Sequence, residues 1–213
     1  LKKQIEDNYK GEHKFICLTD FEDMTCDTIK LKHDLPGWWS KIELFQPELV
    51  SDNPKDVFIF FDLDTCIVGD ITELVEYPHD ITGLAEVNAA GLVPGRFGSG
   101  IAAWRGDKSK IYTEFMKDKV GNMAKYKVGG DQHVIHDSVL VDGKVVFKPV
   151  QKIIDGCLNY KHDLPAMTSH NVKAKENLPD NAKIVYFHGL PKPWDSHVHH
   201  QWLDKELYNI NNY

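Results

Sequence analysis

The feature that most constrains the fold is an apolar run, Val57–Phe61, that leads directly into Asp62 and Asp64. Turn-forming residues flank this stretch on both sides. Such a run is typical of a strand that is buried on both faces of a mostly parallel sheet. Carboxylates at the carboxyl end of such a strand lie where open α/β sheets bind their ligands. We therefore expect an α/β fold with a ligand site at these two aspartates.

The spacing of the two aspartates also predicts the kind of ligand. Side chains at i and i+2 of an extended chain point the same way, about 7 Å apart, and a bend brings them closer. Hard oxygen ligands in this arrangement suit a divalent cation that in turn holds a phosphate-bearing substrate. Alternatively, one aspartate caps the turn and the other is solvated, but an unpaired charge beside a dry strand end is costly.

Composition sets the broad class of the protein. The 213 residues are 42% hydrophobic and 27% charged, which fits one domain over residues 1–213 with a full core. A net charge of −7 without a long Lys/Arg cluster argues against nucleic-acid binding. No apolar run approaches the ~20 residues of a membrane span, and no signal peptide is visible. The four cysteines form no C-x-x-C pair, so we expect a reduced, cytoplasmic protein.

The beginning of the sequence is unusual for this class. The chain opens at Leu1 without an initiator Met, and its first nine residues read as the end of a helix. An α/β domain normally starts with a strand. We therefore expect an N-terminal strand and its loop to precede Leu1.

Three further segments shape the expected fold. A helix from about Trp38 has apolar residues at helical spacing, which places Trp38 in the core and leaves Trp39 either packed at the surface or in contact with an acceptor. Lys41 lies off this stripe, beside the Asp62/Asp64 strand. Residues 91–100 hold four glycines and read as a loop, either mobile or close to a ligand. Residues 108–119 have the pattern of an amphipathic helix.

Two more strand ends carry polar residues that can do chemistry. Gly130 precedes Asp131 and Gln132 at the start of a short helix, where amides favour an acceptor; the simpler interpretation makes Asp131 a helix cap. The strand 182–187 runs into His188 and, four residues later, Lys192. Two carboxylates and one imidazole form a plausible Mn²⁺ or Mg²⁺ site with positions left for diphosphate oxygens.

The ordered set of motifs resembles the glycosyltransferases of GT-A fold, most closely the family 8 group that includes glycogenin and bacterial galactosyltransferases. The resemblance covers about residues 36 to 194. Its blocks are Ser40–Phe45, Phe61–Asp64, Gly130–Gln132 and the stretch His188–Trp194, which resembles the family's terminal H-x-G-x-x-K-P-W block. Two departures stand out: Gly98 replaces the usual Asn before Ser-Gly, and the family's metal-binding histidine position holds Tyr186. His188 lies on the same strand face as Tyr186 and can replace that ligand.

The resemblance implies transfer of a sugar from a nucleoside-diphosphate sugar, most simply a UDP-sugar, to a glycan or other hydroxyl acceptor with retention at the anomeric carbon. No strong general base is evident, which suits a same-face mechanism in which the leaving phosphate accepts the acceptor's proton. The implied roles are metal binding by Asp62, Asp64 and His188; donor binding by Lys41, Asp62, Glu86, Asn88, Gly189 and Lys192; and catalysis by Asp131 and Gln132.

Two alternatives remain open from the sequence. An apolar run before Asp-x-Asp is also the first motif of haloacid-dehalogenase-type phosphatases. In that family, Thr or Val occupies the position that Cys66 has in this chain. The family also has a pair of acidic residues towards the end of the domain, which this chain does not have. The second alternative is a sugar-nucleotide-binding domain without catalysis, against which the intact carboxylates and His188 argue.

Overall fold

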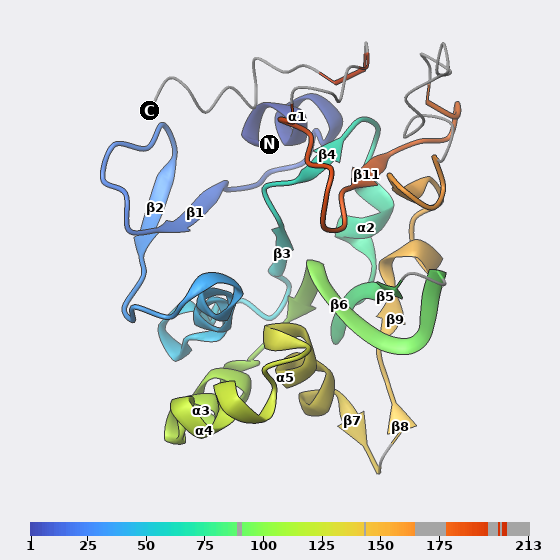
Figure 1. Ribbon diagram of the computed structural model, residues 1–213. Helices are drawn as coiled ribbons and strands as arrows, with labels where there is room; N and C mark the ends of the chain where they lie inside the picture. The colour runs from blue at the N-terminus through green and yellow to red at the C-terminus, as the bar shows by residue number, and fades with distance from the viewer. Residues whose placement is uncertain (89–90, 143, 165–177, 196–199, 201, 204–213) are drawn as a thin grey trace.

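The computed structural model describes residues 1–88, 91–142, 144–164, 178–195, 200 and 202–203. Short helices and strands alternate along the chain, which confirms the predicted α/β class (Figure 1). The helices are α1 Lys2–Asn8, α2 Thr72–Glu76, α3 Ser109–Lys117, α4 Lys119–Lys125 and α5 Gly130–Ser138, with 3₁₀ segments η1 Gly37–Phe45, η2 Pro47–Leu49 and η3 Val150–Lys152. The strands are β1 Ile16–Thr19, β2 Asp27–Lys30, β3 Val57–Phe61, β4 Thr65–Ile67, β5 Ile81–Asn88, β6 Gly91–Arg105, β7 Leu140–Val141, β8 Lys144–Val145, β9 Lys148–Pro149, β10 Cys157–Asn159 and β11 Ile184–Tyr186.

The largest sheet has the strand order β3-β6-β5-β9. Strand β6 pairs antiparallel with both β3 and β5, and only β9 joins β5 in parallel. The sheet is therefore mixed, and the expectation of a mostly parallel sheet is wrong in this detail. In the described part of the chain β3 is an edge strand, and only its last residue, Phe61, is fully buried. The apolar run thus predicted the strand correctly but overestimated its burial.

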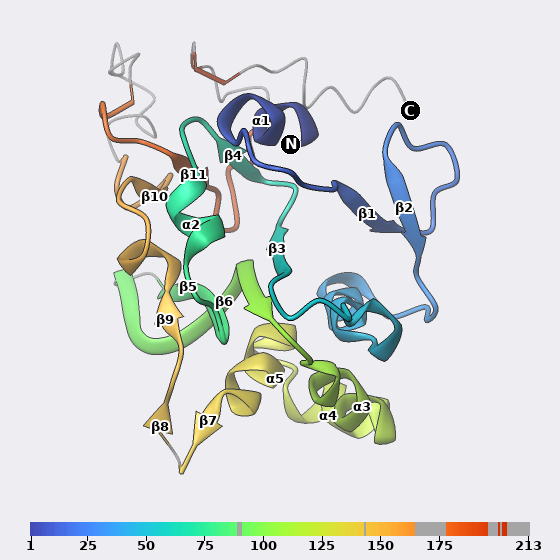
Figure 2. The ribbon, with the colours of Figure 1, turned by 180° about the vertical axis from the view of Figure 1, so that it is seen from behind.

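A second sheet has the order β10-β11-β4. Strand β4 pairs antiparallel with β11, which pairs in parallel with β10. Because β3 belongs to one sheet and β4 to the other, the turn that joins them lies at the junction of the two sheets. This turn is Asp62–Asp64. The β1–β2 pair forms a separate two-stranded sheet that lies to one side of β3 in both views (Figures 1 and 2).

The glycine-rich stretch 91–100 is part of a strand, not the expected loop. It belongs to β6, which pairs with β5 in a register interrupted at two places. Glycine permits this packing at Gly83, where a Cβ atom would lie only 2.3 Å from the Phe97 ring. Because glycine has no side chain, β5 and β6 can pair closely as a hairpin. A high glycine content therefore does not by itself indicate a loop.

Segment η1 corrects the predicted helix from Trp38. It winds as a 3₁₀ helix with three residues per turn, so Trp39, Ile42 and Phe45 share the buried face. Trp39 is 7% exposed, whereas Trp38 is 55% exposed. The predicted roles of the two tryptophans are thus reversed, because the 3.6-residue period was applied to a 3₁₀ segment.

The remaining helices pack around η1 and β6. Helices α3 and α5 contact η1, and α5 also packs on β6 (Figure 1). The predicted amphipathic helix is confirmed as α3, which buries Ile111 and Phe115. Across the residues that the structure describes, no helix combines the length and apolar character that a membrane crossing requires.

Candidate active site at the junction of the two sheets

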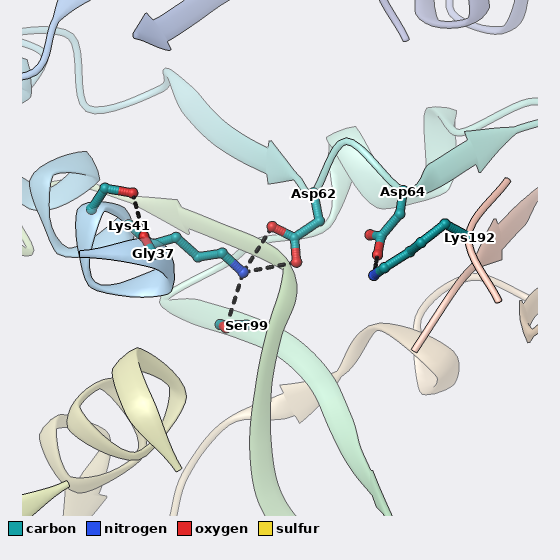
Figure 3. A network of polar contacts seen from close by, with 7 residues as sticks. Gly37, Lys41, Asp62, Asp64, Ser99 and Lys192 are labelled. Atoms are coloured by element: carbon teal, nitrogen blue, oxygen red, sulfur yellow. Dashed lines mark hydrogen bonds and ion pairs between the residues drawn. The ribbon is translucent and has the colours of Figure 1, made fainter. Parts of the chain in front are cut away.

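Asp62 and Asp64 belong to a tight turn in which the Thr65 amide donates to the Asp62 carbonyl at 3.0 Å. Each end of the turn is attached to a different sheet. The Asp62 amide donates to Gly100 of β6 at 2.8 Å, and the Phe187 amide, just after β11, donates to the Asp64 carbonyl at 3.2 Å. Both carboxylates project from the turn on the same side (Figure 3). The turn between β3 and β4 is therefore held by the middle of β6 and by the end of β11, which are far away in the sequence.

Lys41 is the cation beside Asp62. Its ammonium group lies 2.7 Å from each of the two carboxylate oxygens of Asp62 and 3.5 Å from the Ser99 hydroxyl (Figure 3). The Lys41 side chain is only 19% exposed. The expected Lys41 contact beside the acidic strand is therefore present, and the lysine is not a solvated surface residue.

Lys192 is the cation beside Asp64. Its ammonium group forms a hydrogen-bonded ion pair with the Asp64 carboxylate (Figure 3). The backbone amide of Lys192 donates to the Asp195 carboxylate at 2.7 Å, which fixes the turn that carries the lysine. Each carboxylate of the D-x-D motif thus has its own lysine, from a segment far away in the sequence.

Asp131 adds a third carboxylate to the same region. It lies buried in the first turn of α5, whose N-cap residue is Gly129, and hydrogen bonds from the backbone amides of Asp131 and Gln132 partly offset the rise in the pKa of its carboxyl that burial causes. One carboxylate oxygen of Asp131 is buried without a hydrogen-bond partner among the described residues. Asp131 therefore accepts from the first amides of α5, as the simpler interpretation expects, and also has one carboxylate oxygen that no described residue satisfies.

Burial and nearby charges shift the ionisation of Asp62 and Asp131. The pKa of Asp62 is raised to about 6: burial raises it most, the charges of Asp64 and Asp131 add to this, and Lys41 opposes it. Burial also raises the pKa of Asp131, opposed by Lys41 and by a hydrogen bond with Ser99. When acidic groups are partly desolvated and close together, nearby positive charge is required to stabilise their ionised forms. Lys41 and Lys192 supply it in this structure.

His188 follows Phe187, whose amide is bonded to Asp64, and its side chain is exposed. Partial desolvation and the charges of Lys161, His162 and Lys192 lower the pKa of His188, whereas Asp64 raises it. Within the described residues, no group of three or more histidine, cysteine, aspartate or glutamate side chains is close enough together to hold a metal ion. The imidazole is thus near Asp64 without forming a ready ligand cluster. The predicted triad of Asp62, Asp64 and His188 stays a prediction.

The other predicted donor-binding residues fall in two places. Gly189 has a left-handed backbone with φ of +64° in the segment between His188 and Lys192. Gln132 donates to Glu86 at 3.3 Å, so α5 and β5 bring these two residues together. Asn88 is the last residue of β5, and its side chain is outside the described part of the chain.

Trp38 is a neighbour of the site that the sequence misassigned. Gly130 has φ of +63°, and a Cβ atom there would lie 2.4 Å from Nε1 of Trp38. The half-exposed indole therefore rests against the backbone that leads into Asp131. The sequence signal for this role is the pair of adjacent tryptophans. Two neighbouring residues of η1 cannot both face the core, so one of them, Trp38, lies at the edge of the site.

Comparisons with known proteins support the fold. No protein-family model matches this sequence, and a search of curated proteins finds no match. Among solved structures, the glycosyltransferase GlyE from Streptococcus pneumoniae TIGR4 matches with a TM-score of 0.51 at 18% identity, over 86% of this chain and 47% of that one. The galactosyltransferase LgtC, in complex with donor and acceptor sugar analogues, gives a TM-score of 0.46 at 14% identity, over 75% of this chain and 61% of that one.

The fold is therefore that of a GT-A glycosyltransferase, as the resemblance implied. This chain spans less than two thirds of the length of either of these solved structures. The similarity establishes the architecture, and activity has to be argued from the residues of this chain.

Proposed function

We propose that this protein is a metal-dependent glycosyltransferase that moves a sugar from a nucleoside-diphosphate sugar, with UDP as the nucleotide, to a hydroxyl acceptor with retention. One observation carries the proposal. Within a glycosyltransferase fold, the D-x-D carboxylates lie together with Asp131 and two lysines at the junction of two sheets. A site with both signs of charge suits a cation and a diphosphate together.

The donor set fits a hard divalent cation. Asp62 and Asp64 supply oxygen ligands in a partly desolvated region, where burial raises the pKa of Asp62. We propose that these two carboxylates and His188 hold Mn²⁺ or Mg²⁺. Such a cation would stabilise the negative charge that develops on the leaving diphosphate.

Lys41 and Lys192 have a second role in this proposal. Their carboxylate partners, Asp62 and Asp64, would hold the cation, which would leave the two ammonium groups available to the diphosphate. Positive groups aimed at developing negative charge supply a large electrostatic contribution to catalysis. Gly189 has a left-handed backbone and no side chain, so in this proposal the backbone between His188 and Lys192 can approach the same phosphates.

Asp131 and Gln132 are proposed to act on the donor sugar. The buried Asp131 carboxylate lies within electrostatic range of Asp62, and in this proposal it faces the sugar–phosphate bond of the donor. A carboxylate there stabilises positive character at the reacting carbon. Gln132 is anchored by Glu86, which orients its amide. The leaving phosphate accepts the acceptor's proton on the same face, which retains configuration.

The test measures Mn²⁺-dependent hydrolysis of UDP-sugars, with p-nitrophenyl phosphate as the rival substrate. We expect UDP release from UDP-glucose or UDP-galactose that EDTA abolishes and Asp64→Ala lowers by at least about 100-fold, the typical loss of an electrostatic stabiliser. Asp70→Ala, an exposed aspartate that hydrogen-bonds Thr72, serves as the control. Full activity of Asp64→Ala would refute the metal assignment, and phosphatase activity alone would favour the haloacid-dehalogenase-type alternative.

The cysteines support the expected compartment. None of the four, all of which lie in the described part of the chain, forms a disulfide. We propose on this basis that the enzyme works in the cytoplasm, where thiols stay reduced.

A further inference from the structure

Glu43 is a fully buried carboxylate that the proposed chemistry does not use. It lies in η1, two residues after Lys41, and its exposed fraction is 0%. Its carboxylate oxygens accept from the backbone amide of Lys32 at 2.6 Å, from the amide of His33 at 3.1 Å and from the Gln46 side chain at 2.9 Å. Moving a carboxylate out of water is costly, and charge-assisted hydrogen bonds such as these offset that cost.

The hydrogen bonds of Glu43 attach η1 to a backbone segment that is itself anchored on two sides. Lys32 and His33 lie just after β2, and the amide of Leu31 donates to the Thr19 carbonyl at the end of β1 at 3.2 Å. On the other side, the His33 ring forms a hydrogen bond with a tyrosine hydroxyl of α3, that of Tyr112, at 2.7 Å. Glu43 therefore joins η1 to the β1–β2 pair and to α3 at once.

The three-residue period of η1 links this attachment to the proposed active site. A 3₁₀ helix has three sides, and one of them in η1 is the buried apolar face. Glu43 lies on the second side. Trp38 and Lys41 lie on the third side, where the indole of Trp38 rests against Gly130 and the Lys41 ammonium group contacts Asp62 (Figure 3). The rotation of η1 about its axis therefore decides where Lys41 points.

Apolar packing alone does not fix this rotation, because hydrophobic contacts are non-directional. Runs of 3₁₀ helix longer than about four residues are uncommon, whereas η1 has nine residues and no side-chain hydrogen bond at its N-cap. The same residues also fit a 3.6-residue period, which would bury Trp38 in place of Trp39. Hydrogen bonds are directional, so the three bonds of Glu43 select the observed rotation.

Resting on the proposed transferase function, in which Lys41 binds the diphosphate, we propose that Glu43 is a positioning residue for Lys41. Glu43 holds η1 in the rotation that directs Lys41 to the D-x-D turn. Because a lysine side chain is flexible, the direction in which it leaves the backbone decides whether its ammonium group reaches Asp62 or solvent. Glu43 thus acts on the diphosphate site through Lys41.

Acetic anhydride labelling of lysines, mapped by mass spectrometry, tests the positioning without any ligand. Acylation needs an accessible, neutral amine, so the ion-paired and largely buried Lys41 should react slowly in the unmodified protein. Glu43→Gln keeps the side-chain shape but turns an NH₂ group towards backbone amides, so Lys41 should react at least about tenfold faster, the effect of one lost charge-assisted hydrogen bond. Lys192, which pairs with Asp64, should keep its rate. An unchanged Lys41 rate, or an equal acceleration of Lys192, would overturn the inference.

Glu48→Gln is the matched control, because it makes the same substitution at an exposed carboxylate that pairs with Lys32. It should leave the Lys41 rate unchanged. A second variant, Gln46→Met, removes one donor to Glu43 and keeps the carboxylate, so it tests the inference even where Glu43→Gln does not fold. Lys41 should react at least about twofold faster in Gln46→Met, because one of three hydrogen bonds is lost. An unchanged rate in this variant would also overturn the inference.

A double-mutant cycle on UDP binding separates this inference from the function on which it rests. In saturating Mn²⁺, Lys41→Met and Glu43→Gln should each weaken UDP binding at least about fivefold in isothermal titration. The double variant should bind UDP no more weakly than Lys41→Met, because a residue that acts through another adds nothing once that residue is removed. Additive losses would overturn the inference. Faster labelling of Lys41 in Glu43→Gln, in a protein that binds no UDP, would support the positioning role and refute the proposed function of Lys41.

Discussion

At the scale of single residues, Asp62 shows a conflict between stability and the proposed function. Its carboxylate is desolvated and close to two other acids, and only Lys41 offsets this. The folded-state pKa of about 6 lies above the ordinary value, so the folded protein binds the proton more tightly than the unfolded chain does. A carboxylate kept in such a place at a cost in stability is typical of binding and catalytic sites.

We predict that Asp62→Asn stabilises the protein near neutral pH. Because the folded-state pKa is raised, ionisation of Asp62 costs stability as pH rises from about 4 to about 6. Removing the charge should therefore raise the free energy of unfolding by about 1–2 kcal/mol at pH 7 and change it little at pH 4. Urea denaturation in EDTA at both pH values measures this.

Asp70 gives the matched control for the sign of that effect. Hydrogen bonds from Thr72 lower the pKa of the Asp70 carboxyl, so its ionised form stabilises the fold. Asp70→Asn should therefore reduce stability at pH 7 and lose its effect as pH falls below about 4. A loss of stability at pH 7 in Asp62→Asn as well would contradict the proposed cost of its charge.

The two adjacent tryptophans give a second prediction at this scale. Trp39→Ala should reduce the free energy of unfolding by about 3–5 kcal/mol because it opens a cavity beside Phe115, on which the indole stacks. Trp38→Ala should cost less than about 1 kcal/mol because its indole is half exposed. Chemical denaturation of both variants decides between this order and the reverse one that the 3.6-residue period predicts.

At the scale of elements, the sequence correctly predicts a helix or strand when its hydrophobic pattern fits only one type of secondary structure. Helix α3 was predictable because Ile111 and Phe115 mark a clear amphipathic face. The sequence predicts the wrong buried face for η1 because spacing by three and by four residues both occur within Trp38–Phe45. It predicts a loop for the first part of β6 because the local glycine content hides a pairing with β5 that depends on the tertiary structure.

The start of α5 depends on a glycine at position 130, and Gly106 is its matched control. Both have positive φ, but a Cβ atom at Gly106 meets nothing within 4 Å, whereas one at Gly130 would overlap Trp38. Gly106→Ala should therefore cost only the backbone strain, about 1–2 kcal/mol. Gly130→Ala should cost more and should lower UDP-sugar hydrolysis at least about tenfold, because it displaces the turn that leads into Asp131. Equal activity losses in the two variants would refute this role of Gly130.

At the scale of the whole molecule, the site exists because two sheets meet at one turn. The residue types of the site could be predicted from ordered motifs, and Asp62, Asp64, Lys41 and Lys192 do come together. Their pairing could not be predicted, because it depends on which sheet each strand joins. The ion pair of Arg96 with Glu86 could not be predicted either, since it depends on the pairing of β5 with β6.

The pairing of each D-x-D carboxylate with a lysine predicts coupled binding of metal and nucleotide. Mn²⁺ must compete with Lys41 and Lys192 for the carboxylates, and a diphosphate offers the lysines another partner. We expect UDP to raise the affinity for Mn²⁺ at least about fivefold, and Mn²⁺ to raise the affinity for UDP by the same factor, because binding linkage is reciprocal. Isothermal titration of each ligand, with and without the other, measures both factors.

The variant Lys192→Met locates the source of that coupling. Without its lysine, Asp64 is available to the cation, so Mn²⁺ alone should bind more tightly than to the unmodified protein, while UDP in the presence of Mn²⁺ should bind more weakly. Lys183→Met is the control, because Lys183 pairs with Glu73 on α2. Its coupling factor should equal that of the unmodified protein. If Mn²⁺ and UDP bind independently in the unmodified protein, the lysines are structural partners of the carboxylates, and the exchange from carboxylate to diphosphate does not occur.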